Sequence, residues 1–199
     1  MNIVSIVIPT VKTEREIARL ISEIKSTVVH ELDLIIVSGM RTTSVNRNIG
    51  LDKARGEFVI MCDDDTEGYP HGWDRDLIDV LKQTGASMVG PRLLNPDGTL
   101  QLTNCKNFDL SKDFVKVRTI IAACCAFRNT KLRYDENYIG WGWEDTDFCR
   151  QIWENCGGSF FIVNTVKVTH RNEEKDPLGS KETRAENQVY FGNKWGRKR

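Results

Sequence analysis

Three consecutive carboxylates, Asp63-Asp64-Asp65, follow an apolar run that ends at Cys62. Alternate side chains of an extended segment point to the same face, so Asp63 and Asp65 should lie on one side and Asp64 on the other. Adjacent carboxylates repel one another unless a cation or strong donors neutralise them. Such oxygen ligands suit Mg²⁺ or Mn²⁺ carrying the phosphates of a nucleotide. A helix-capping acidic turn is the alternative for an isolated Asp-x-Asp.

A second acidic segment, Glu144-Asp145-Thr146-Asp147, opens a region with helical spacing. An apolar stripe on this helix predicts that Asp145 begins the buried face and that Asp147 and Glu154 lie away from it; the stripe comprises Asp145, Phe148, Cys149, Ile152 and Cys156. Partial burial raises the pKa of a carboxylate, as a general base requires. The alternative is that these acids only stabilise the positive end of the helix.

Two indoles, Trp141 and Trp143, precede this helix and are separated by glycine. Their apolar faces could stack on a ring-shaped substrate, and the alternative is that they fill the core. A helix cap alone would not explain them. They therefore favour a binding role for this segment.

The bulk properties point to one globular domain. A chain of 199 residues can bury a full core, and its 28 basic and 28 acidic residues give no global charge for a nucleic acid or membrane. The basic tail, residues 194–199, is either solvated or contacts an anionic acceptor or lipid. No segment resembles a membrane span or signal peptide. The six cysteines, which include Cys105, contain no zinc-type pair, so we expect small buried side chains in a cytoplasmic protein.

Strand and helix patterns alternate through the first half, which predicts an α/β fold with a mostly parallel central sheet flanked by helices. Strands are expected at 3–8, where Pro9 stops the strand, and at 32–37, 58–62 and 87–89. Helices are expected from a capping box at Thr13 and Glu16, from 44 to 54, and from about 73 to 81. The second half predicts a turn at 95–98, a β-rich run at 119–127, a helix at 144–155, a strand or bent strand at 159–169 and a final helix from 180.

The ordered motifs resemble those of GT-A glycosyltransferases, specifically the family-2-like group, over most of residues 1–170. The segments that carry the resemblance are Val7-Ile8-Pro9-Thr10, Asn46-Arg47-Asn48-Ile49-Gly50, Asp63-Asp64-Asp65, Gly90-Pro91-Arg92 through Gly98, and Gly140-Trp141-Gly142-Trp143-Glu144-Asp145. The last segment is also similar to the acceptor motif of β4-galactosyltransferases and polypeptide N-acetylgalactosaminyltransferases. The resemblance implies one nucleotide-diphospho-sugar transferase domain, with residues 1–100 binding the nucleotide sugar, 101–175 carrying acceptor and catalytic groups, and 176–199 forming a helix and basic tail.

The resemblance also implies roles for individual residues. Asp65 would bind the metal directly, Asp63 would bind it through water or hold ribose, and His170 would be a third ligand. Asp145, with Glu144 beside it, would be the general base of an inverting reaction. Trp141, Trp143 and Arg92 would contact the acceptor or sugar. The expected nucleotide-binding residues are Pro9, Thr10, Glu14, Ser38, Arg47, Asn48, Asp63 and Asp64.

One departure from the family pattern concerns the nucleobase. Val37-Ser38-Gly39-Met40-Arg41 stands where the family usually has Asp-Asp-Gly-Ser, so Ser38 offers a single hydrogen bond in place of a carboxylate. A UDP-sugar with Mn²⁺ or Mg²⁺ is the family default. A saccharide, a protein, a lipid-linked glycan and a modified nucleic-acid base stay open as acceptors.

Two other functions are compatible with this type of sheet. A sugar-nucleotide nucleotidylyltransferase would carry a glycine-rich phosphate loop after the first strand, and Pro9-Thr10-Val11-Lys12 has no glycine. A binding module without catalysis would keep the nucleotide pocket alone. The presence of Asp63, Asp65, Asp145 and His170 favours an enzyme.

Overall fold

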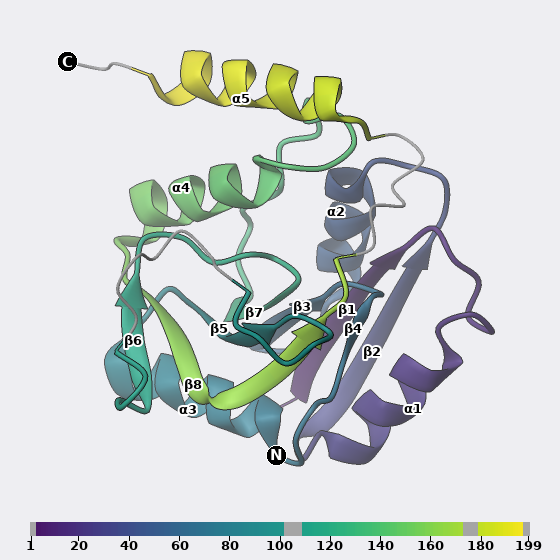
Figure 1. The fold of residues 1–199 in the computed structure, drawn as a ribbon, viewed down its shortest axis with the longest axis vertical. Helices are drawn as coiled ribbons and strands as arrows, with labels where there is room; N and C mark the ends of the chain where they lie inside the picture. Colours follow the sequence, from purple (N-terminus) through teal and green to yellow (C-terminus); the bar gives the residue numbers. More distant parts are fainter. Residues whose placement is uncertain (1–2, 102–108, 173–178, 197–199) are drawn as a thin grey trace.

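The computed structural model describes residues 3–101, 109–172 and 179–196, which form a central sheet with helices on both faces (Figure 1). The strands are β1 (Ile3–Thr10), β2 (Glu31–Ser38), β3 (Phe58–Cys62), β4 (Thr66–Glu67), β5 (Met88–Leu94), β6 (Phe114–Val117), β7 (Cys124–Arg128) and β8 (Phe160–His170). Their spatial order is β2-β1-β3-β7-β5-β8-β4, and β6 pairs with β8. The predicted α/β class with a helix-flanked sheet is confirmed.

The sheet is mixed, in contrast to the expected mostly parallel pairing. β1 is parallel to β2 and β3, and β5 is parallel to β8. β7 is antiparallel to β3 and β5, while β4 and β6 are antiparallel to β8. A parallel connection needs a long crossover, usually a helix, and no helix lies between β5 and β7 in the described parts of residues 95–123. The chain therefore returns antiparallel there.

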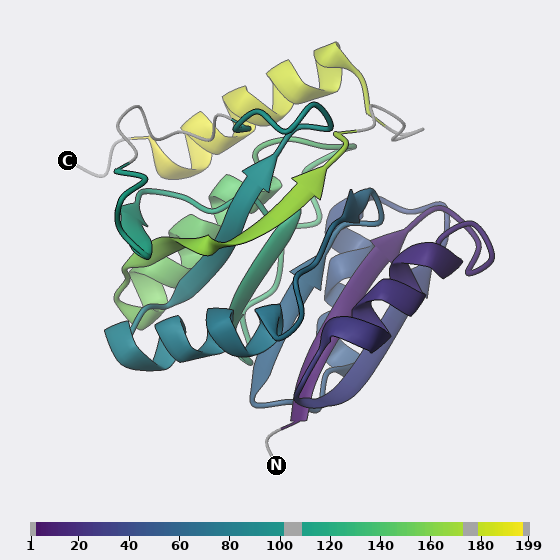
Figure 2. The same cartoon turned by 60° about the horizontal axis from the view of Figure 1, so that its bottom comes forward.

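Four helices cover the two faces of the sheet. α1 (Ala18–Thr27) and α3 (Trp73–Thr84) pack on one face, and α2 (Thr43–Lys53) and α4 (Glu144–Cys156) pack on the other (Figure 2). Each pair covers its own apolar cluster, because successive strand side chains alternate between the faces. α5 (Lys181–Trp195) lies outside these layers beside α4 (Figure 1).

Several boundaries differ from the predictions for physical reasons. β1 continues through Pro9 to Thr10, because its pairing with β3 ends at Val7 and Pro9 needs no ladder N–H on that side. α1 begins only at Ala18, and the Glu16 carboxylate accepts the Thr13 N–H at 2.7 Å without a reciprocal cap. The short strands β4 and β6 have no clear sequence signal.

The cysteines follow the prediction with one exception. The thiols of Cys62, Cys124, Cys125 and Cys149 are free and buried, whereas that of Cys156 is exposed. Cys156 was wrongly placed on the buried face: it is the last residue of α4, beyond the final buried residue, Ile152. Cys105 lies outside the described residues. None of the helices in the described parts of the chain combines the length and apolar character that a membrane span needs.

Candidate active site

A cleft of about 460 Å³ opens where β1 and β3 end. From the first half, Pro9 and Thr10 contribute to its wall, together with all three residues of the Asp63–Asp65 run. From the second half come Trp141, Glu144 and His170. Strand ends at such an edge are the usual ligand sites of α/β sheets, so this cleft is the candidate active site.

Asp63, Asp65 and His170 converge on one point of the cleft. One ligand atom from each lies within 4.8 Å of the others, and His170 Nε2 is 3.4 Å from Asp65 Oδ1. His170 Nδ1 donates to the side-chain oxygen Oε1 of Gln101 at 2.8 Å, which turns Nε2 toward the acids. Burial alone would lower the pKa of His170, but the carboxylates of Asp65 and Asp63 outweigh it and raise that pKa. Two carboxylates and an imidazole are a donor set that fits Mn²⁺ or Mg²⁺.

Asp64 points away from this group, as the alternation predicted. Its carboxylate accepts a short hydrogen bond from Thr10 and lies 3.2 Å from Lys12 Nζ. Lys12 N–H in turn donates to Thr10 Oγ1 at 2.9 Å. The middle carboxylate of the run therefore ties the acidic turn to the end of β1.

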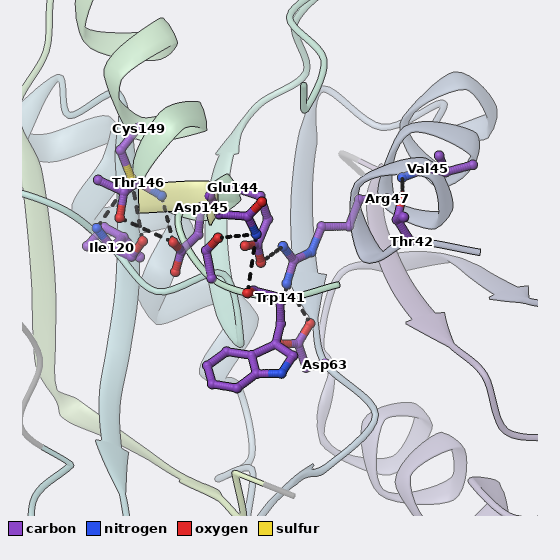
Figure 3. A network of polar contacts seen from close by, with 12 residues as sticks. Thr42, Val45, Arg47, Asp63, Ile120, Trp141, Glu144, Asp145, Thr146 and Cys149 are labelled. Atoms are coloured by element: carbon purple, nitrogen blue, oxygen red, sulfur yellow. Dashed lines mark hydrogen bonds and ion pairs between the residues drawn. The ribbon is translucent and has the colours of Figure 1, made fainter. Parts of the chain in front are cut away.

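Asp63, Asp65 and His170 are called the metal-type group below. Arg47 links this group to α4 (Figure 3). Its guanidinium is buried, with Nη2 3.0 Å from Asp63 Oδ1 and Nη1 3.1 Å from Glu144 Oε1. It also lies over the Tyr134 ring, 5.1 Å from the centroid. Burial raises the pKa of Asp63, Arg47 opposes that rise, and the charge of Asp65 adds to it. Arg47 was expected to contact the nucleotide; it lines the cleft, but both sides of its fork hold protein carboxylates.

Glu144 is a buried acid at the cleft wall. Burial raises the pKa of Glu144 to about 7, the charge of Asp145 adds to the rise, and Arg47 opposes it. Its Oε2 atom is buried and has no hydrogen-bond partner in the described structure. One carboxylate oxygen of Glu144 is thus held by Arg47, and the other is enclosed.

The predicted burial pattern of α4 agrees with the structure for Asp145 and Glu154 but is wrong for Asp147. Asp145 is half-buried, and its Oδ1 accepts the Thr146 N–H at 2.6 Å. Asp147, expected to face away from the core, is fully buried. It lies beneath α5, where Lys194 Nζ and Trp195 Nε1 approach Oδ1 at 2.8 and 2.6 Å. α5 therefore covers the side of α4 that carries Asp147, which the apolar stripe predicted to be exposed.

The two indoles separate in the structure. Trp141 lines the cleft, and the Arg184 guanidinium lies 5.0 Å from the centroid of its ring. Trp143 is not among the described residues that line the cleft, and its ring packs on Phe191 of α5 at 5.1 Å. Its backbone φ is 78°, in the left-handed region. Trp141 thus faces the cleft, Trp143 packs on α5, and acceptor binding by these indoles stays a prediction.

Besides Trp143, five predicted residues lie outside the cleft lining of the described structure, and the predicted base Asp145 is one of them. Ser38 donates to the Lys12 carbonyl at 2.8 Å, and Glu14 is exposed. Asn48 is buried and donates to the Tyr134 carbonyl at 2.9 Å, which is a structural contact. Arg92 was expected to approach the sugar; it is buried between β5 and β8, where it donates to Asn164. The side chains of Ser38, Asn48 and Arg92 thus form contacts within the protein.

Several polar cleft residues were not among the predicted site residues. They include Lys12, Arg41, Asn46, Gln101, Asn172 and Arg184. Gln101 and Asn172 lie in loops, and Arg184 comes from α5, so only the tertiary arrangement brings them to the site. Lys12, directly after β1, is the one that a search for charges at strand ends could have found.

The mixed sheet, its helices and the acidic turn after β3 together define a GT-A glycosyltransferase fold. The model of glycosyl transferase family 2 matches residues 36–150, more than half of the chain, and the protein belongs to that family.

A solved structure described as GalNAc-T7 with UDP, GalNAc and Mn²⁺ has the same fold, with a TM-score of 0.74 and 15% sequence identity. The alignment covers 100% of this chain and 49% of that one, so this chain spans about half the length of the matched structure. No curated protein sequence matches this chain.

Proposed function

We propose that this protein transfers a sugar from a nucleotide-diphosphate sugar to an acceptor hydroxyl, with Mn²⁺ or Mg²⁺ as cofactor. The convergence of Asp63, Asp65 and His170 in one cleft carries this proposal. A divalent cation held there would act as a Lewis acid on the leaving diphosphate. The description of GalNAc-T7 with UDP and Mn²⁺ makes a UDP-sugar the first donor to test.

The donor would lie at the ends of β1 and β3. Pro9 and Thr10 line this part of the cleft, and Thr10 and Lys12 hold Asp64 out of the metal group. Arg47 neutralises Asp63 and Glu144 from inside the protein. These contacts keep the repelling carboxylates in place before a substrate arrives, and such preorganisation is a main source of electrostatic catalysis.

Asp145 is our candidate for the general base. In a single displacement the acceptor oxygen bonds to the anomeric carbon, the bond from that carbon to the diphosphate oxygen breaks, and the hydroxyl proton passes to the Asp145 carboxylate. This step inverts the anomeric centre. Asp145 is the more accessible of the two acids, because Glu144 Oε2 is enclosed and Glu144 Oε1 is held by Arg47. The family resemblance of Gly140–Asp145 supports the same choice.

A donor panel is the decisive experiment. UDP-, GDP-, CDP- and dTDP-sugars would be incubated with and without Mn²⁺ or Mg²⁺, and release of nucleoside diphosphate would be measured together with thermal shift. We expect one donor to be turned over only with metal, and Asp65→Ala to abolish that turnover. Tight nucleotide binding without turnover on any acceptor would instead favour a binding module. Pyrophosphate release from a nucleoside triphosphate and a sugar phosphate would indicate a nucleotidylyltransferase.

A further inference from the structure

The first turns of α5 complete the cleft on the side of Trp141. Arg184, on this helix, is a lining residue although it lies beyond the family match of residues 36–150. Its guanidinium stacks over the Trp141 ring at 5.0 Å. A cation and an aromatic face thus stand side by side at the cleft wall. Neither the donor site nor the base requires this pair.

Arg184 and Arg41 differ from the other cations of the cleft in forming no ion pair with a described carboxylate, and Arg41 Nη1 instead donates to Asn46 Oδ1 at 3.2 Å. Lys12 pairs with Asp64, and Arg47 pairs with Asp63 and Glu144. Within residues 3–101, 109–172 and 179–196, no carboxylate forms an ion pair with Arg184. A guanidinium that is held at a cleft without a charge partner is suited to bind an anionic group of a ligand.

The loop that carries Trp141 is held to α5 by one buried amide. Asn187 is the only described residue of α5 that is fully buried. Its Oδ1 accepts the Ile139 N–H at 3.2 Å, and its Nδ2 donates to the carbonyls of Ile139 at 2.8 Å and Gly142 at 3.0 Å. These contacts satisfy backbone groups of a loop whose Gly140 and Gly142 have positive φ angles.

Gly142 also lies in close contact with the side chain of Arg184. A Cβ atom built on Gly142 would lie 3.0 Å from Arg184 Cγ and would push the arginine stem outward, and the φ of 94° at Gly142 also favours glycine. Asn187 therefore fixes the loop, and the loop in turn fixes where the guanidinium of Arg184 stands. Both residues act on the same wall of the cleft.

We propose that Arg184 and Trp141 form an acceptor subsite for a molecule with a phosphate or carboxylate group, and that Asn187 is a positioning residue for it. The indole stacks on the acceptor ring while Arg184 binds its anionic group through charge-assisted hydrogen bonds. This inference rests on the proposed glycosyl transfer and names the chemical class of its acceptor.

The test compares a matched pair of probes. Protein saturated with UDP and Mn²⁺ is titrated with glucose and with glucose 6-phosphate, and binding is followed by calorimetry. We expect glucose 6-phosphate to bind more tightly than glucose, and Arg184→Gln to lose about ten- to hundredfold of that affinity. The affinity for UDP should not change. Lys181→Gln, which removes the same charge from an exposed position of the same helix, is the control.

Asn187→Ala tests the positioning role. We expect it to weaken glucose 6-phosphate binding while UDP affinity stays at the wild-type value, with the folded state checked by circular dichroism. Asn187→Ala that lowers only the melting temperature would show a purely structural residue and overturn that part of the proposal.

Two results would overturn the subsite itself. One is equal binding of glucose and glucose 6-phosphate to the wild type. The other is loss of UDP affinity in Arg184→Gln, which would assign this arginine to the donor diphosphate. The proposed function is judged separately, because metal-dependent donor turnover by the wild type is measured without any acceptor.

Discussion

The Arg47 guanidinium lies 3.1 Å from the Glu144 carboxylate, although the two residues are 97 positions apart in the chain. The same guanidinium holds Asp63 of the metal-type group at 3.0 Å. One buried cation thus connects the donor end of the cleft with the helix that carries the candidate base. Substitution of Arg47 should therefore affect both Asp63 and Glu144.

Arg47→Met should destabilise the fold strongly. It would leave Asp63 and Glu144 without their shared cation, and breaking a buried pair from one side costs about 3–5 kcal/mol. The measurement is urea unfolding of wild type and variant at pH 7. Arg75→Met serves as the control, because its partner Asp76 and its own side chain are exposed and such pairs contribute about 0–1 kcal/mol. An equal effect of the two substitutions would contradict the bridge.

Glu144 should make stability depend on pH. Its pKa of about 7 in the folded protein exceeds its ordinary value of 4.5, so between these values the folded state keeps a proton that the unfolded state has lost. The contribution is complete below pH 4.5 and falls as pH rises toward 7, by about 3 kcal/mol at most. Glu144→Gln should flatten this slope, as measured by urea unfolding from pH 4.5 to 8.

Glu154→Gln, on the exposed part of the same helix, controls for the loss of one negative charge from α4. Its slope should stay parallel to that of the wild type. A Glu144→Gln variant with an unchanged slope would mean that Glu144 is ionised throughout this range.

Substitution of Asp65 should weaken metal binding far more than substitution of the neighbouring Asp64. Asp65→Asn removes a carboxylate from the group that faces His170, whereas Asp64→Asn changes one that faces Thr10 and Lys12. We expect Mn²⁺ to raise the melting temperature of wild type and Asp64→Asn, and to have little effect on Asp65→Asn. Calorimetric titration with Mn²⁺ gives the affinities directly. Similar losses in both variants would exclude the assigned ligand set.

The docking of α5 depends on a buried charge pair. Asp147 has no exposed side-chain surface, and Lys194 Nζ lies 2.8 Å from its Oδ1. Lys194→Met should therefore cost about 1–3 kcal/mol, because it leaves a buried carboxylate with neutral donors such as Trp195 Nε1 and without its lysine. In the double variant with Asp147→Asn the loss should be smaller than the sum of the single losses. Additive effects in this double-mutant cycle would show that the pair is not coupled.

Only part of the metal-type group could be predicted from a local rule, and the family resemblance supplied His170 as a ligand. Asp63 and Asp65 alternate with Asp64 directly after β3, and His170 is the last residue of β8. β8 brings His170 beside the acidic turn through its pairing with β4, where Thr66 is opposite His170. Alternation therefore separated Asp64 from Asp63 and Asp65, whereas the pairing of β4 with β8 that brings His170 to them was not predicted.

The side-chain positions of the second half could not be predicted as well, because they depend on where α5 packs. A helical stripe shows which face of α4 meets the sheet, but it does not show that another helix covers Asp147. The same helix draws Trp143 onto Phe191 and brings Arg184 to the cleft. α5 itself packs through polar contacts, with Asn187 as its one buried residue, so its pattern does not predict where it docks.

Asp145→Asn provides the test of the base. The variant keeps the size of the side chain and an oxygen that can accept the Thr146 N–H, so the start of α4 should stay intact. The amide cannot take up the proton of the acceptor hydroxyl, and loss of general-base catalysis lowers turnover by about 10²–10⁴-fold. We expect that fall in kcat, with donor affinity from UDP titration close to the wild-type value. Glu144→Gln is the matched comparison: if Asp145→Asn retains turnover while Glu144→Gln loses it, the proton is taken by Glu144 after its enclosed oxygen becomes accessible in the substrate complex.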